Sequence, residues 1–306
     1  MLDPVKLETL RAVTQHRSFS AAAAALNLTQ PAVSRQIAAL ERQLGTHLVR
    51  RLRGRVDATP AGELLLRHAT VALDRLALAE AQVRSLVTAH GNVVRLGSFF
   101  SALVHLSAEA GAILGDTHPG LRIADDLVDR AEAYAKVGRG DIDLALVFTH
   151  RFTSTPAPDG VRVRRLFDDP LRVLVPAGHP AAGRTAVDLA DLRDDVWIRA
   201  HDGALARLLD LALADRGLHP PLLLAGHGEE PVEVQALVAA GRGITLSYDL
   251  TVVVSEHDLR LISIIGAPAG RTVSVAVPDG PLTPPVRATL DALIEVGRRR
   301  GAAVRP

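Results

Sequence analysis

Three runs of apolar residues at helical spacing open the chain, and they predict three short helices before residue 45. The first helix is expected to end near His16. The second is expected over Ala21–Leu26, with Ser18 or Ser20 as its N-cap. Asparagine tolerates the left-handed backbone conformation, so a tight turn at Asn27 follows before Thr29 caps the third helix.

The third helix is predicted to have one apolar face and one polar face. Its apolar face is an expected buried stripe with spacings of four, three and four residues, made of Val33, Ile37, Leu40 and Leu44. The polar side chains of this helix lie off the stripe, and they are Gln30, Ser34, Arg35 and Gln36. We count the cap residue Thr29 and the first-turn proline Pro31 with them as candidates for DNA contact. Arginine can bond to guanine and glutamine to adenine in the major groove, so the pattern favours a helix-turn-helix. A small helical bundle with a solvated polar face would show the same spacing.

A short hairpin is predicted over residues 48–56, with its tip near Gly54. Four of the six positions from 50 to 55 are arginines, and the candidates for phosphate contact are Arg50, Arg53 and Arg55. A run of charge is usually a solvated face. This run directly follows a candidate recognition helix, which favours a DNA-contacting wing.

A long helix is predicted between Pro60 and residue 91. Small and apolar residues recur there with alternating spacings of four and three, which is a heptad seam; they are Leu65, Ala69, Ala72, Leu76, Ala79, Val83 and Leu86. The seam predicts that two copies of the helix pair as a dimer. The alternative is a long helix that lies against its own domain.

Strands and helices alternate from Val93 onward, which predicts parallel α/β units in two lobes. The expected strands cover residues 93–97, 121–127, 142–148, 171–176, 196–199, 222–225, 244–246 and 271–277. The expected helices cover residues 102–114, 131–137, 205–215, 232–240 and 285–298. The last strand and helix are expected to return to the first lobe and complete its sheet.

Charge, cysteine content and hydropathy narrow the class of protein. Residues 1–60 carry nine basic and four acidic side chains, a net charge of +5, whereas the remainder has −4. A basic head on a mildly acidic body is typical of a nucleic-acid-binding protein. The chain has no cysteine, which excludes disulfides and thiol chemistry. It shows no apolar run long enough for a membrane helix and no signal peptide, so we expect a cytoplasmic protein without membrane contact.

Motifs of catalysis and metal binding are missing from the sequence. It has no Gly-x-Ser-x-Gly, no His-Glu-x-x-His and no phosphate-binding Gly-x-x-x-x-Gly-Lys-Ser/Thr motif. We therefore expect no enzyme, no cofactor and no metal site. A solute-binding protein that never touches DNA and a non-specific nucleoid protein remain as alternatives.

A dense motif covers residues 18–23, Leu26, residues 29–37, Leu40-Glu41, Leu44-Gly45 and Leu48, and a Thr-x-Ala-Gly segment follows at 59–62. In this motif the first sixty residues resemble the N-terminal domain of LysR-type transcriptional regulators. Two apolar substitutions depart from the family pattern: Leu10 stands where an aromatic residue is common, and Val49 where phenylalanine is usual. Residues 140–146 and 236–244 are similar to segments of the family's effector domain, which resembles periplasmic binding proteins.

The resemblance implies an α+β multidomain architecture. Residues 1–59 would form a winged helix-turn-helix, 60–91 a linker helix for dimerisation, and 92–306 an effector-binding domain. In that domain, lobe I would take about 92–166 and 270–306, and lobe II about 167–269. Implied partners are double-stranded DNA, a small-molecule effector, RNA polymerase, and a second copy of the chain in a homodimer or homotetramer.

Effector residues are expected where strands end at the cleft between the lobes. The candidates are Ser98, Phe99, Phe100, Ser101, Thr149, Arg199, His201, His227 and Thr245. A helix start after Ser98 would favour a carboxylate, and Arg199 would grip it with a fork of two hydrogen bonds. The two phenylalanines favour an aromatic effector.

Overall fold

The computed structural model describes residues 1–52, 55–87, 92–150, 156–225, 232–252, 258–266 and 270–303. The chain divides into two compact units, one of residues Met1–Val87 with the short segment Gly138–Asp141, and one of Thr88–Val137 and Ile142–Pro306. Among the described residues, no helix combines the length and hydropathy needed to cross a membrane.

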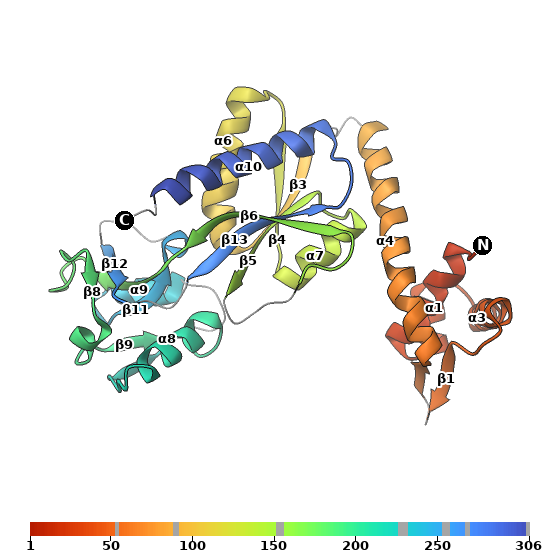
Figure 1. The fold of residues 1–306 in the computed structure, drawn as a ribbon, viewed down its shortest axis with the longest axis horizontal. Coiled ribbons are helices and arrows are strands. Elements are labelled where there is room, and N and C mark those ends of the chain that lie inside the picture. The colour runs from red at the N-terminus through yellow and green to blue at the C-terminus, as the bar shows by residue number, and fades with distance from the viewer. Residues whose placement is uncertain are drawn as a thin grey trace. The chain divides into compact units, whose positions relative to one another are not determined.

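The first unit is a winged helix followed by a long helix (Figure 1). Its elements are α1 (Pro4–His16), α2 (Phe19–Ala25), α3 (Gln30–Leu44), β1 (Val49–Leu52), β2 (Arg55–Ala58) and α4 (Pro60–Val87). Ser18 is the N-cap of α2, and its hydroxyl accepts from the Ala21 N–H. Asn27 has a positive φ of 53°, which confirms the predicted left-handed turn before α3.

The buried stripe of α3 is one residue shorter than predicted. Val33, Ile37 and Leu40 lie in the core of the first unit, but Leu44 is 42% exposed. The helix ends at Gly45, whose φ of +67° turns the chain away, and Leu48 fills the core next. The prediction for Leu44 was wrong because the chain reverses before a fourth contact can form.

The helix α4 has two kinds of surface along its length. Ala69 is buried, and Leu65 and Leu73 pack against the core of the first unit. Beyond them the apolar side is exposed in this single chain, with Leu76 at 49% and Val83 at 59%. Ala72 and Ala79 are also exposed, and the side chain of Leu86 lies outside the described part. The helix therefore rests on its own domain at one end, and the seam residues Ala72, Leu76, Ala79 and Val83 are exposed.

A five-stranded sheet organises the first lobe of the second unit, with strand order β4-β3-β5-β13-β6. Its elements are β3 (Val93–Ser98), α5 (Phe100–Ala102), a π-helical turn (Leu103–Ser107), α6 (Ala108–Thr117), β4 (Arg122–Leu127), α7 (Arg130–Arg139), β5 (Leu144–His150), β6 (Val161–Asp169), β13 (Arg271–Pro278) and α10 (Pro284–Ala303). Residues of α6 and α10 share a core with one side of the sheet, and residues of α7 pack on the other. The predicted return of the last strand and helix to this lobe is confirmed.

The second lobe contains a four-stranded sheet of order β11-β7-β12-β8 and a pair of strands, β10-β9. Its elements are β7 (Leu171–Pro176), β8 (Ala186–Val187), a 3₁₀ turn (Leu189–Leu192), β9 (Trp197–Arg199), α8 (Ala204–Ala214), β10 (Leu222–Leu224), α9 (Val232–Ala239), β11 (Thr245–Tyr248), a 3₁₀ turn (Asp249–Thr251) and β12 (Leu259–Ile264). Trp197 is fully buried in its core, and its indole N–H donates to the carbonyl of Leu192 at 3.1 Å.

The prediction of parallel α/β units is wrong in part, because both main sheets are mixed. The strands β4, β3 and β5 are parallel, whereas β13 runs antiparallel to β5 and β6. In the second lobe β7 is antiparallel to both of its neighbours. The strands β6, β8 and β12 were not predicted. Charged residues fill the exposed face of β6, and β8 has only two residues, so neither shows a clear apolar pattern.

Candidate nucleic-acid interface and effector site

The N-terminal half of α3 presents the side chains that were predicted to contact DNA. Gln30 and Arg35 are exposed, and Ser34 is half-buried, on the side of the helix away from the core. Thr29 is the N-cap residue by backbone geometry, but its side chain makes no capping hydrogen bond. The prediction of a side-chain cap was wrong, and the exposed Thr29 hydroxyl is therefore not occupied by a capping bond.

The side-chain amide of Gln36 points partly toward the inside of the first unit, because its oxygen accepts a hydrogen bond there. Its side chain hydrogen-bonds to the hydroxyl of Thr9, which is fully buried in α1. A contact of this kind holds α3 against α1. It leaves only the remainder of the amide for any partner outside the domain.

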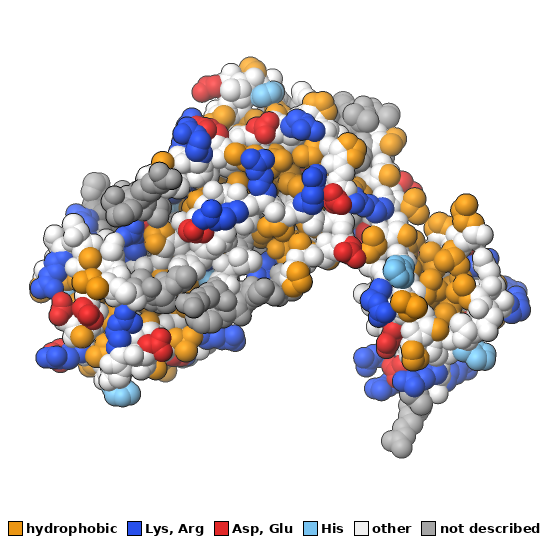
Figure 2. Space-filling model, in the orientation of Figure 1, with side chains coloured by type: hydrophobic (Ala, Val, Ile, Leu, Met, Phe, Trp, Pro, Cys, Tyr) orange, Lys and Arg blue, Asp and Glu red, His pale blue; other side chains and the backbone are white. Residues whose placement is uncertain are grey.

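The wing arginines differ in their surroundings. Arg50 is exposed, whereas the Arg55 guanidinium lies 3.0 Å from the Asp57 carboxylate. The guanidinium of Arg51 sits over the Phe19 ring of α2 at 5.1 Å. Arg53 lies outside the described residues. Figure 2 shows Lys and Arg side chains gathered at the wing end of the first unit.

Glu41 fastens the wing to the recognition helix, a role that the sequence pattern did not suggest. Its Oε1 atom accepts from the backbone N–H of Leu48 at 2.8 Å and from that of Val49 at 3.3 Å. The side chain is only 17% exposed. Both N–H groups belong to the segment that starts the wing, so Glu41 sets where the wing leaves α3.

The Thr-x-Ala-Gly segment joins the wing to α4, and close contacts fix its backbone. The Thr59 hydroxyl donates to the carbonyl of His47 at 2.7 Å and accepts from the Gly62 N–H at 3.1 Å. A Cβ atom at Gly62 would lie 2.0 Å from the carbonyl oxygen of Leu48. Only glycine allows this approach, which gives the motif a steric reason.

The segment that runs from the last residue of β3 into α5, Ser98–Ser101, forms what we call the effector loop. Ser98 is fully buried, and its hydroxyl has no hydrogen-bond partner among the described residues. Phe99 and Phe100 are half-buried. Ser101 is 3% exposed, and its hydroxyl accepts from the Arg271 guanidinium at 3.1 Å.

Arg199 is not the open anion fork that the sequence suggested. Its Nε and Nη2 atoms donate to the two Asp210 carboxylate oxygens at 2.8 and 2.6 Å. This contact holds the pKa of Asp210 below and that of Arg199 above the usual range. The fork of Arg199 is therefore already occupied by a carboxylate of its own lobe, one helix further along the chain.

The other predicted effector residues fall into three groups. Thr149 at the end of β5 is half-buried and His201 is exposed. Thr245 is buried, and its hydroxyl donates to the carbonyl of Ile198 at 2.7 Å. His227 lies outside the described part of the chain.

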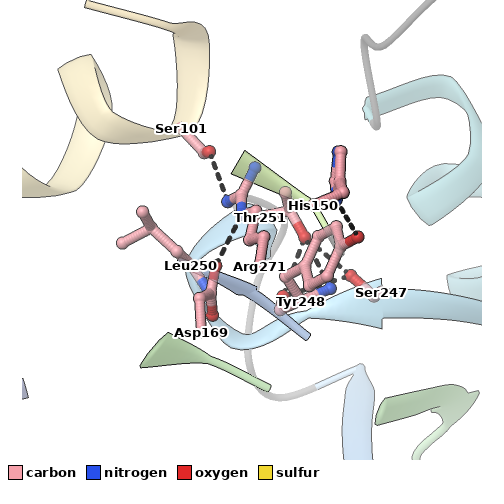
Figure 3. Close-up of polar contacts among 8 residues, drawn as sticks. All are labelled: Ser101, His150, Asp169, Ser247, Tyr248, Leu250, Thr251 and Arg271. Atoms are coloured by element: carbon pink, nitrogen blue, oxygen red, sulfur yellow. Dashed lines mark hydrogen bonds and ion pairs between the residues drawn. The ribbon is translucent and has the colours of Figure 1, made fainter. Parts of the chain in front are cut away.

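A buried ion pair joins the effector loop to both lobes (Figure 3). The Arg271 Nε atom donates to the Asp169 Oδ2 atom at 2.9 Å, and the side chains are 4% and 1% exposed. The second oxygen of Asp169 accepts from the Leu250 N–H of the second lobe at 3.1 Å. Burial raises the pKa of Asp169, and the charge of Arg271 opposes that rise.

Aromatic rings from both lobes surround the Arg271 guanidinium. The ring centroids of Phe99, Phe148 and Tyr248 lie 5.0, 4.8 and 4.5 Å from its central carbon. Phe99 comes from the effector loop, Phe148 from β5 and Tyr248 from β11. Such contacts favour a desolvated guanidinium.

His150 extends this cluster at the end of β5. Its Nδ1 atom lies 3.0 Å from the Tyr248 hydroxyl, and the two rings stack at 5.8 Å. Burial lowers the pKa of His150 to about 4, with smaller contributions from the charges of Arg271 and Arg130. The imidazole is therefore neutral at neutral pH.

Sequence reasoning did not single out Arg271 or Tyr248 as site residues. The available signals were an arginine that opens an otherwise apolar strand, and one of only two tyrosines in the chain. Neither signal names a partner, because Asp169 and Arg271 are 102 residues apart.

A winged helix with an arginine-bearing wing and a two-lobed α/β unit together define a ligand-responsive DNA-binding protein. Residues 5–63 match the family described as bacterial regulatory helix-turn-helix protein, lysR family, and residues 89–298 match the LysR substrate binding domain. The chain belongs to the LysR-type transcriptional regulators, which are regulators of transcription and not enzymes.

Individual relatives match over most of their length. The small neutral protease regulatory protein of Streptomyces lividans is 30% identical over 303 residues, covering 97% of this chain and 84% of that protein. The RuBisCO operon transcriptional regulator of Allochromatium vinosum is 28% identical over 258 residues, covering 84% and 80%.

Solved structures show the same fold. Full-length BenM aligns with a TM-score of 0.53 at 23% identity and covers 98% of both chains. CbnR, a LysR family transcriptional regulator, aligns with a TM-score of 0.53 at 20% identity and covers 98% of this chain and 99% of its own.

Proposed function

We propose that the protein binds a specific DNA operator through two winged helices and responds to a small molecule held between its two lobes. The proposed DNA binding is supported by the exposed polar side chains in the N-terminal half of α3. This helix is followed by an arginine-bearing wing, and both belong to the basic part of the chain. Exposed Gln and Arg side chains at a helix N-terminus suit base edges in the major groove.

The DNA contacts divide by chemistry. Gln30, Ser34 and Arg35 would contact base edges, with Gln36 in a smaller role because Thr9 shares its amide. Thr29 and Pro31 lie at the start of α3, where a helix N-terminus approaches a phosphate. Arg50, Arg53 and Arg55 would lie along the phosphate backbone, which positions the protein and adds little sequence information.

Dimerisation through α4 would supply the second reading head. The exposed apolar residues Leu76 and Val83 are the support for this pairing. A dimer reads two half-sites that are related by two-fold symmetry, and two dimers would give the homotetramer. Contact with RNA polymerase would follow from a position next to a promoter.

The effector would lie against the effector loop and the ends of the neighbouring strands. Support comes from the buried Ser98 hydroxyl without a partner in the described structure, and from the rings of Phe99 and Phe148. Thr149, Arg199, His201, His227 and Thr245 remain candidates for the other walls. Because Arg199 and Arg271 already have carboxylate partners, we favour an aromatic effector over a simple carboxylate.

A footprinting experiment tests the proposal. The purified protein is titrated onto the DNA immediately upstream of its own gene, with random DNA as competitor and at several salt concentrations. A bounded footprint with two-fold symmetry that resists the competitor is the expected result. Binding that the competitor removes at every salt concentration would overturn sequence-specific recognition.

Replacing Arg35 with alanine, Arg35→Ala, should weaken operator binding by about 1–3 kcal/mol, because a bidentate contact with guanine is lost. Titrations on the operator and on random DNA measure this difference. The matched control is Arg42→Ala, which removes an exposed arginine from the C-terminal half of the same helix. An equal loss on operator and random DNA would remove Arg35 from base recognition.

A further inference from the structure

The two chain segments that connect the lobes meet at one point. The chain leaves the first lobe at Asp169, the last residue of β6, and returns at Arg271, the first residue of β13. These two residues are partners in the antiparallel register. A Cβ atom at Gly270 would lie 2.1 Å from the carbonyl oxygen of Asp169, so the segments are in direct contact there.

The side chains at this point make contacts in both directions. Arg271 donates to Asp169 at 2.9 Å and to Ser101 in the effector loop at 3.1 Å. Asp169 in turn accepts from the Leu250 N–H of the second lobe at 3.1 Å. A chain of three hydrogen bonds therefore runs from the effector loop through the ion pair to the second lobe, as Figure 3 shows.

The aromatic contacts follow the same route. Phe99 of the effector loop and Tyr248 of the second lobe both face the Arg271 guanidinium, at 5.0 and 4.5 Å. A movement of the effector loop would change the surroundings of a buried cation. Buried charges tolerate the loss of a partner poorly, so this cluster favours one complete arrangement over intermediate ones.

We propose that Asp169 and Arg271 form a latch that holds the effector loop and the second lobe in one arrangement, with Arg271 as the positioning residue through which the loop acts. This inference rests on the proposed function for its regulatory meaning, because it assigns to the effector loop a route to the second lobe. The contacts of the latch themselves do not depend on the identity of the effector.

Distance measurement between the lobes tests the latch. The chain has no cysteine, so a pair of introduced cysteines can carry spin labels without background labelling. Asp116→Cys in α6 and Asp194→Cys in the second lobe are both at exposed positions. Labelled protein is diluted with unlabelled protein to suppress distances between copies, and pulsed electron paramagnetic resonance gives the distribution of interlobe distances.

The variants compare two adjacent carboxylates. Asp169→Asn places an amide N–H₂ against the Arg271 guanidinium or the Leu250 N–H, and breaks the bridge in either case. Its matched control is Asp168→Asn, because Asp168 is exposed and, within the described part of the chain, contacts Arg165 and Thr272 of the first lobe. We expect the distance distribution to widen at least twofold for Asp169→Asn and to stay unchanged for Asp168→Asn.

A double variant separates the loss of the latch from a general loss of stability. Asp169→Asn combined with Arg271→Met removes both charges, a replacement that proteins often tolerate without loss of stability. A wide distribution in this variant, at a melting temperature near that of the unaltered protein, supports the latch. A distribution as narrow as that of the unaltered protein would overturn it. A failed footprint would remove the operator function and leave these distances unchanged, so the two hypotheses fail separately.

Discussion

The variant Arg271→Met is expected to lower the free energy of unfolding of the second unit by about 3–5 kcal/mol at neutral pH. It leaves the Asp169 carboxylate, 1% exposed, without the cation that compensates it. The Leu250 N–H remains bonded to one carboxylate oxygen, but a single amide does not neutralise a buried charge. The contacts of the guanidinium with three aromatic rings are lost as well.

The loss should shrink in acid. Burial raises the pKa of Asp169, and Arg271 opposes the rise, so removing Arg271 raises this pKa further. The folded variant then binds a proton more tightly than the unfolded chain. The free energy of unfolding of the variant falls as the pH rises from the ordinary carboxyl pKa to the raised pKa of Asp169. Above the raised pKa it no longer changes with pH through this group. Below the ordinary pKa the carboxyl is neutral in both states, and the penalty of its buried charge is absent.

Fluorescence of Trp197 during urea unfolding measures this effect. It is the single tryptophan of the chain, and it is fully buried in the second lobe. The control is Arg165→Met, which breaks an exposed ion pair with Asp168 and should cost about 1 kcal/mol at most. Equal losses for the two variants at every pH would contradict the assigned importance of the buried pair.

The variant Gly62→Ala is expected to destabilise the first unit by about 2–3 kcal/mol and to weaken operator binding. Two effects oppose each other at this position. Alanine favours a helix over glycine by about 1 kcal/mol. Its Cβ atom, however, would lie 2.0 Å from the Leu48 carbonyl oxygen, a backbone atom that can move only if the start of the wing moves. The steric term is therefore expected to win.

Hydrogen exchange of the wing residues 49–58 measures the local effect, and calorimetry of the whole chain measures stability. The control is Gly111→Ala in α6, where the added Cβ meets nothing within 4 Å. That variant should gain about 0.5–1 kcal/mol from helix propensity alone. If Gly62→Ala also gains stability, the wing start is free to shift and the steric reason for the motif is wrong.

Helical parts of the fold were predictable because their information is local. The caps, the Asn27 turn and the apolar spacing of α3 depend on residues within a few positions of one another. Two predictions on α3 were wrong: the Thr29 side chain makes no capping hydrogen bond, and Leu44 is exposed because the chain reverses at Gly45 and ends the packing. The helix α4 (Pro60–Val87) lies within the predicted range of 60–91, but only the structure separates its contacts with its own domain from the exposed part of its seam.

The effector site was predictable only at the level of strand ends. The Ser98–Ser101 loop lies where the order of elements placed it, after the first strand of the lobe. Arg199 was expected to be open, but the structure pairs it with Asp210, since helix α8 brings that carboxylate alongside. The proposed role of each residue toward an effector remains a prediction.

The sequence by itself determined the winged helix, the long helix, the order of strands and helices apart from β6, β8 and β12, and the regulator family. Spacing, caps and a dense motif encode these features within short windows. The tertiary structure alone decided which strands became antiparallel neighbours, and hence that Arg271 meets Asp169 across 102 residues. It alone also decided how the two lobes pack, which brings Tyr248 to His150 across 98 residues. Hydrophobic periodicity tells which face of a strand is buried. It does not tell which distant strand lies beside it, and that choice places the buried charges at the junction of the lobes.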